Sequence, residues 1–161
     1  ADTFGLELEA RGRAGTLLPF AFDPKTPLDV RASVNFYESR VKGVPGPDNR
    51  LDRQQPWSGT LGLDYVLSGM IPAPIRLGGS VSFTPGYRTQ QTTEQSIEFA
   101  RSRTIDLYAN VPISPKISVR FIANNVAPFA SENTTAYANQ SATYTVSKPR
   151  TWYGIVLSVK G

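Results

Sequence analysis

The chain has 161 residues, of which 40% are hydrophobic and 19% are charged, and its formal net charge is +4. It contains no Cys and no His, which excludes thiol nucleophiles, Cys/His zinc sites and Ser-His-Asp triads. The basic residues are spread along the chain without a Lys/Arg-rich run, so no nucleic-acid partner is expected. We therefore expect a protein that is not an enzyme and that needs no metal or other cofactor.

Apolar and polar residues alternate with a period of two along most of the chain, which places them on opposite faces of β-strands. In the second such segment, for example, Leu28, Val30 and Val34 alternate with Asp29 and Arg31. The segments are, in chain order, 4–11, 28–37, 57–65, 75–84, 105–111, 117–124 and 153–160. No segment has a convincing helical period. The pattern predicts an all-β, antiparallel protein of about seven strands.

One further stretch, 134–146, alternates weakly through Tyr137, Ala142, Tyr144 and Val146, and is the candidate for an eighth strand. No Gly/Pro-rich or polar linker divides the chain, so 1–161 is predicted to form one segment without internal domain boundaries.

The segments that connect the predicted strands alternate in length. Short or proline-containing turns are predicted at 68–74 and 112–116. Long polar connections are predicted at 40–56, 89–101 and 128–150, and the first connection, 14–27, is an exception because it is longer than the pattern requires. Short turns on the periplasmic side and long loops outside are typical of an up-and-down transmembrane β-barrel.

The polar face of the predicted strands carries charged residues near mid-strand. They are Glu7, Glu9, Arg31, Asp64, Arg76, Asp106 and Arg120. In a transmembrane barrel this face would line the lumen and the apolar face would meet lipid. In a soluble sandwich the polar face would meet water and the apolar face a second sheet. The period of two does not choose between these interpretations.

Several aromatic residues occupy apolar positions of the alternation near one end of their predicted strands. They are Phe4, Phe36, Trp57, Phe83 and Tyr153, whereas Tyr65 falls near the other end. If the last strand runs towards the periplasm, the five lie at the outer end, as in the aromatic girdle of a membrane interface. Strand-end aromatics are also common in other β-proteins.

Counting back from the predicted turns places several opposite charges across from each other. Arg11 would face Asp29, Glu9 would face Arg31, and Asp64 would face Arg76. Each such pair contributes only about 0.2–1 kcal/mol. The pairs would set the register and solvate a wet lumen, or they would be incidental to a solvated face.

Several segments resemble parts of known outer-membrane proteins. The run Gly5-Leu6-Glu7-Leu8-Glu9 resembles a G-x-E-x-E strand of TonB-dependent receptors, and 39–51 is similar to one of their outer loops. Segments 61–65 and 79–87 resemble following strands. Segment 105–125 resembles the late barrel pattern D-x-Y … L-R-x-x-x-N-N, with Val119 at the Leu position, and Pro149-Arg150-Thr151 leads into a final strand in the same style. The order of these segments resembles the C-terminal barrel portion of a TonB-dependent outer-membrane receptor.

This resemblance implies a location in the bacterial outer membrane and a barrel of about 22 strands that is closed by an N-terminal plug. The present chain would supply the C-terminal third or less of that wall. The family takes up siderophores, cobalamin, glycans or similar nutrients. Its partners would be the lipid bilayer, the rest of the barrel with the plug, a small nutrient ligand, and TonB. Neither a plug nor a TonB box is recognisable in this sequence, so TonB would act through another part of the parent chain.

Ligand contacts are predicted in the long outer loops, where basic and aromatic side chains suit anionic chelates or sugars. The candidates are Arg50, Arg53, Trp57, Arg88, Arg101, Arg103, Tyr137 and Tyr144. The neighbouring carboxylates Glu7 and Glu9 are expected to solvate the lumen instead of doing acid–base chemistry. Asp48 and Asp52 lack the D-x-D-x-D-G spacing of a calcium loop, so no metal site is predicted.

Two other interpretations fit the alternation. The first is a self-contained small outer-membrane barrel of about eight strands, with a structural or adhesive role. The second is a soluble β-sandwich that acts as a ligand-binding module. Detergent dependence distinguishes them, because a sandwich stays dispersed in plain buffer and a barrel does not.

Overall fold

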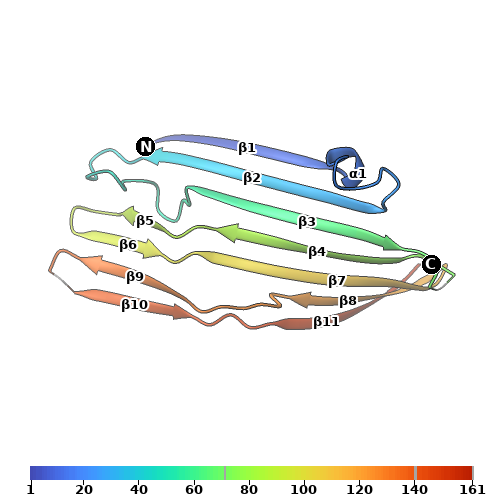
Figure 1. Cartoon of the computed structure of the whole chain (residues 1–161). Coiled ribbons are helices and arrows are strands. Elements are labelled where there is room, and N and C mark those ends of the chain that lie inside the picture. Colours follow the sequence, from blue (N-terminus) through green and yellow to red (C-terminus); the bar gives the residue numbers. More distant parts are fainter. Residues whose placement is uncertain (71, 140, 161) are drawn as a thin grey trace.

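The computed structural model describes residues 1–70, 72–139 and 141–160, and Figure 1 shows its arrangement. The described part contains two antiparallel sheets and one short helix. The elements are β1 (Asp2–Arg13), α1 (Ala14–Leu17), β2 (Leu28–Arg40), β3 (Trp57–Leu67), β4 (Ile75–Thr84), β5 (Tyr87–Gln90), β6 (Gln95–Phe99), β7 (Ser102–Ser114), β8 (Ile117–Asn124), β9 (Ser131–Tyr137), β10 (Ala142–Ser147) and β11 (Trp152–Val159).

The larger sheet has seven strands in the order β1-β2-β3-β4-β7-β8-β11, and every neighbouring pair is antiparallel. Each strand contains one of the seven alternating segments, so the predictions of an all-β fold and of these seven strands are confirmed. The sheet is not closed on itself, because β1 and β11 form its two edges.

The smaller sheet, ordered β10-β9-β6-β5, lies beyond one end of the larger sheet (Figure 1). The chain connects β10 to β11, β9 to β8, β6 to β7 and β5 to β4. The smaller sheet therefore repeats the strand order of the larger sheet at that edge. Three of the four interruptions contain a proline, at Pro85, Pro128 and Pro149. Proline has no N–H to donate to a ladder, so the hydrogen bonding of the long strands breaks there.

This second sheet corrects two of the predicted loops. Segments 89–101 and 128–150 were expected to be irregular, but they contain parts of the β5–β6 hairpin and the whole β9–β10 hairpin. The candidate eighth strand at 134–146 is instead two strands, with Gln140 outside the described residues. Because β9 and β10 pair in the smaller sheet, they do not close the larger one as a small barrel would require.

The apolar residues of the larger sheet form one continuous face. Directly paired residues of an antiparallel ladder point to the same side. One row across all seven strands runs through Gly12, Val30, Leu63, Gly79, Leu107, Ala123 and Tyr153. The apolar residues of all seven strands therefore point to the same side of this sheet.

This apolar face is not covered by other parts of the described chain. Leu6, Leu63 and Ile155 expose 46%, 42% and 71% of their surface. Among the described residues, Ala14 in α1 is the one buried hydrophobic side chain. The two stacked sheets that a soluble sandwich requires are therefore not found in residues 1–70, 72–139 and 141–160.

The connections differ at the two ends of the larger sheet, as predicted. The β3–β4 and β7–β8 turns lie at one end together with α1, while loop 41–56 and the two hairpins lie at the other (Figure 1). The unexpectedly long 14–27 connection is partly accounted for by α1, in which Ala14 and Gly15 are buried. No helix in the described residues is long and apolar enough to cross a membrane.

The predicted register was wrong by two residues in both hairpins that were considered. Arg11 lies opposite Arg31, Arg13 lies opposite Asp29, and Glu9 lies opposite Ser33. In the β3–β4 hairpin, Asp64 lies opposite Gly78. A shift of two residues leaves every side chain on its original face, so the alternation of the sequence does not reveal it.

Candidate functional site

The seven charged residues predicted for the polar face do share one face of the larger sheet. The ladders place Arg31 in one row with Ser80 and Asp106, and place Arg76 in one row with Asn110 and Arg120. The remaining members are Glu7 and Glu9 in β1 and Asp64 in β3, and the ladders place them on the same face as Arg31. Exposure of this face to a lumen stays a prediction.

The ion pair in the middle of this face joins β2 to β3. Arg31 Nη2 lies 3.2 Å from Asp64 Oδ2. The guanidinium lies over Gly62, where an added Cβ would be 3.4 Å from Arg31 Nε. Arg31 therefore pairs with Asp64 rather than with Glu9, and it turns away from the like charge of Arg11, which lies opposite it in the ladder.

A second interaction on the polar face joins β4, β7 and β8. The guanidinium carbon of Arg120 lies 4.3 Å from the centre of the Tyr108 ring, a cation–π contact. The ring in turn lies over Gly78, where an added Cβ would overlap it. Beside the first interaction is a hollow of about 340 Å³ over β1 to β4, which is lined by Arg31 and by short or polar side chains that include Ser33, Thr60 and Ser80.

Asp106 has a structural role that its place in the alternation did not indicate. Its Oδ1 accepts a hydrogen bond of 2.8 Å from the backbone N–H of Asn125, which follows β8 and has φ of 52°. Asn is one of the few residues that adopt this left-handed conformation readily. Thr151 Oγ1 donates to the Asn125 carbonyl at 2.9 Å, so β7 and the segments that flank β8 and β11 are joined here.

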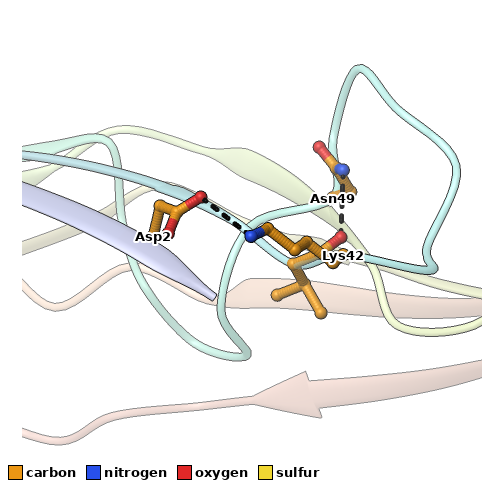
Figure 2. Close-up of polar contacts among 4 residues, drawn as sticks. Asp2, Lys42 and Asn49 are labelled. Carbon is orange, nitrogen blue, oxygen red and sulfur yellow. Dashed lines mark hydrogen bonds and ion pairs between the residues drawn. The ribbon is translucent and has the colours of Figure 1, made fainter.

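Loop 41–56 is held together largely by Asn49. Its side-chain amide donates to the carbonyl oxygens of Val41 and Val44, at 3.2 and 3.0 Å. Figure 2 shows Asn49 beside Lys42, whose Nζ lies 3.9 Å from Asp2 Oδ2 at the start of β1. These contacts lie where loop 41–56 leaves β2, next to the start of β1.

The same loop packs against β5 and brings charged groups to Tyr87. Gln90 N donates to the Asp48 carbonyl at 2.8 Å. Tyr87 stacks on Phe99 with ring centres 4.7 Å apart. Burial raises the pKa of the Tyr87 phenol and Asp52 raises it further, while Arg50 and Arg53 act in the opposite direction. The phenol is therefore neutral at neutral pH and can donate a hydrogen bond.

Arg50 is the most unusual of the predicted ligand residues. Its Nε and Nη1 atoms are buried and have no hydrogen-bond partner among the described residues. The fully buried Thr89 in β5 also has an unpartnered hydroxyl. Buried guanidinium nitrogens without an acceptor are costly, so an anionic group from a ligand or another chain segment would stabilise this region.

The other predicted ligand residues fall in separate places. Arg88 and Tyr137 line one hollow at the tip of the smaller sheet, where Arg88 Nη2 donates to Ser96 Oγ at 3.1 Å. Arg101 and Arg103 line another hollow at the boundary between the sheets. Arg53 is exposed beside Asp52, and Tyr144 is exposed on β10. The structure therefore does not gather all eight candidates into one site.

Trp57 was grouped with the ligand candidates of the outer loops, but it lies on a strand, as the alternating segment 57–65 predicted. It is the first residue of β3, lies opposite Phe36 on the apolar face, and has its ring centre 5.4 Å from that of Phe83. These three aromatic residues are adjacent at the end of the face that is next to loop 41–56. Phe4 lies opposite Glu38, and Tyr153 lies opposite Ala123, apart from the others. The structure therefore brings together three of the five aromatic residues that were expected to form a girdle, and the girdle itself stays a prediction.

No protein-family model, curated protein or solved structure matches the chain. In the part of the chain that the structure describes, no three or more Asp or Glu side chains are grouped closely enough to hold a metal ion.

Proposed function

We propose that this chain forms part of the wall of a bacterial outer-membrane β-barrel that belongs to a TonB-dependent nutrient receptor. The observation that carries the proposal is the apolar face, which is continuous over seven strands and remains exposed in the structure. Soluble monomeric proteins rarely leave so large an apolar area in water. The opposite face is polar and charged, as expected for a wall between lipid and an aqueous lumen.

The dimensions of the larger sheet fit a bilayer. Its strands have 8 to 13 residues, and a tilted transmembrane strand needs about 9–11. The aromatic cluster of Phe36, Trp57 and Phe83 would mark the outer interface of the membrane. The smaller sheet and loop 41–56 would then extend outside the membrane.

The open edges support a longer wall. Unpaired backbone N–H and C=O groups in hydrocarbon cost several kcal/mol each, so β1 and β11 would have to pair with further strands. A wide barrel of about 22 strands also leaves a lumen that a plug can fill. The proposed partners of this chain are therefore the remaining wall strands and a plug, with TonB acting on the plug side.

The receptor part of the proposal is supported by the outer surface. Loop 41–56 and the smaller sheet, which would lie above the proposed membrane, carry basic and aromatic side chains that include Arg50, Arg88 and Tyr137. These side chains suit an anionic chelate or a sugar. Arg50 is the first candidate for ligand contact because its buried nitrogens have no acceptor among the described residues.

Cysteine labelling tests the membrane orientation, because the chain contains no Cys of its own. Leu63 and Asp64 are consecutive residues of β3, so their side chains lie on opposite faces of the sheet. The variants Leu63→Cys and Asp64→Cys are therefore matched controls of each other. In outer membranes that contain the whole parent protein, a fluorescent label on Leu63→Cys should be quenched by brominated lipids and one on Asp64→Cys should not. Equal access of both sites to a water-soluble quencher would contradict the barrel wall.

Uptake by whole cells tests the receptor. Cells that lack the parent protein are compared with cells that produce it, using radiolabelled cobalamin and a panel of radiolabelled ferric siderophores and glycans. Uptake that requires both the protein and the inner-membrane proton gradient is the expected result. Uptake of every probe without either requirement would overturn the receptor while leaving the barrel wall to the labelling experiment.

A further inference from the structure

Two arginines lie at the outer end of the apolar face. Arg103 is opposite Phe83 in the β4–β7 ladder, on the same side as Val81 and Ile105. Arg101, just before β7, lines a hollow of about 270 Å³ together with Arg103, Phe83 and Phe129. A cation on the side of a barrel that faces lipid is tolerated near an interface and costly at mid-membrane. The two arginines are therefore placed at the level of lipid head groups.

The positive charge in this hollow is not neutralised by the protein. Arg103 Nη2 donates to the Ala127 carbonyl at 3.2 Å, and its guanidinium carbon lies 5.5 Å from the centre of the Phe129 ring. None of the four lining side chains is acidic. Within the described residues, neither Arg101 nor Arg103 has a carboxylate oxygen within 4.0 Å. Guanidinium groups bind phosphate oxygens with strong, charge-assisted hydrogen bonds, so the complementary group is an anion of this kind.

A long apolar depression begins one step further along the same strands. Ile105 and Leu107 follow Arg103 on this face, and they line a hollow of about 490 Å³ together with Leu61, Leu63 and Val81. Gly79 lies on the floor of this hollow, where the Leu107 side chain covers the position that a Cβ would take. Residues on one face of a strand are about 6.8 Å apart, so the depression starts within one such step of Arg103.

We propose that this surface binds one lipid whose phosphate group sits between Arg101 and Arg103 and whose acyl chain lies along the depression over Gly79. The inference rests on the proposed function, since it requires the apolar face to meet a membrane. A lipid fits better than a free phosphate because the cationic and apolar hollows adjoin on one face. A soluble anion would use the first hollow alone.

The test uses the parent protein purified in a mild detergent. Dioleoyl phosphatidic acid and dioleoyl phosphatidylcholine are titrated separately, and bound lipid is counted by native mass spectrometry. We expect a preference for phosphatidic acid, because its phosphate is not balanced by a cationic head group. The double variant Arg101→Gln/Arg103→Gln should weaken phosphatidic acid binding by about 30-fold, from roughly one charge interaction per arginine.

The matched control is Arg11→Gln/Arg13→Gln, which removes two arginines from the polar face of β1 and should leave the preference unchanged. Inorganic phosphate is added as a competitor, and displacement of phosphatidic acid at equal concentration would overturn the lipid as occupant. Equal binding of both lipids by the unmodified protein would overturn the site. If the Leu63→Cys label is nevertheless quenched by lipid, only this inference fails and the barrel wall stands.

Discussion

Gly79 occupies a position on the apolar face where no side chain fits. An added Cβ would lie 2.7 Å from Leu107 Cδ2 and 2.8 Å from the backbone oxygen of Asp106. The side-chain atom can move, but the backbone oxygen belongs to the β4–β7 ladder. Gly79→Ala should therefore lower the free energy of unfolding by about 1–3 kcal/mol, as in other overpacked sites. Urea unfolding of the protein in detergent micelles, followed by Trp fluorescence, measures this change.

Gly59 provides the control, because it lies on the same face and has more room. The nearest atoms to an added Cβ are Trp57 Cζ3 at 3.6 Å and the Ser33 carbonyl oxygen at 3.7 Å. Gly59→Ala should change the free energy of unfolding by less than about 0.5 kcal/mol. Equal losses in the two variants would show that the close approach of β4 to β7 is not the cause.

At the scale of single residues, the sequence identified the charged groups but not their partners. Asp64 was expected to pair with Arg76, whereas it pairs with Arg31 on the other neighbouring strand. Asp106 was recognised as a polar-face residue, but its bond to the Asn125 N–H depends on the fold of the segment after β8. Contacts of this kind join residues far apart in the chain, so local alternation carries no information about them.

The β9–β10 hairpin is an element that the larger sheet does not need for its hydrogen bonds. β9 pairs with β10 and β6, and all three belong to the smaller sheet. Replacing residues 131–147 with a short Gly-Ser turn should therefore leave the larger sheet folded. Retention of the heat-modifiable gel mobility that is typical of folded barrels is the expected result. The control is Tyr144→Ser, which changes one exposed residue of the hairpin. Loss of the heat-modifiable mobility on replacement of the hairpin, with the mobility kept in the control, would show that the two sheets fold as one unit.

The elements that alternation missed are short or consist mainly of polar residues. β9 consists mainly of polar residues, Ser131-Glu132-Asn133-Thr134-Thr135, and β5 has four residues. A strand that is polar on both sides, or that has only four residues, gives no clear period of two. The seven strands of the larger sheet were found because one of their faces is consistently apolar.

At the scale of the whole molecule, the proposed membrane sets a strong asymmetry between the two faces. Leu63→Arg places a charge in the middle of the apolar face, and a cation at the bilayer midplane costs about 2–4 kcal/mol. Ser80→Arg, on the polar face one strand away, should cost far less because water solvates the charge. Unfolding of both variants by urea from lipid vesicles measures the difference. Similar free energies of unfolding would indicate that both faces meet water.

The sequence by itself determined which residues lie on which face, because a strand alternates its side chains with a period of two. It also determined which connections are short and which are long. Only the tertiary structure decided the register, the Arg31–Asp64 pair, the second sheet beyond the prolines, and the open edges of β1 and β11. The physical reason is that ladder hydrogen bonds join backbone groups that are alike in every residue except proline. Strand partners are therefore chosen by contacts across the whole sheet.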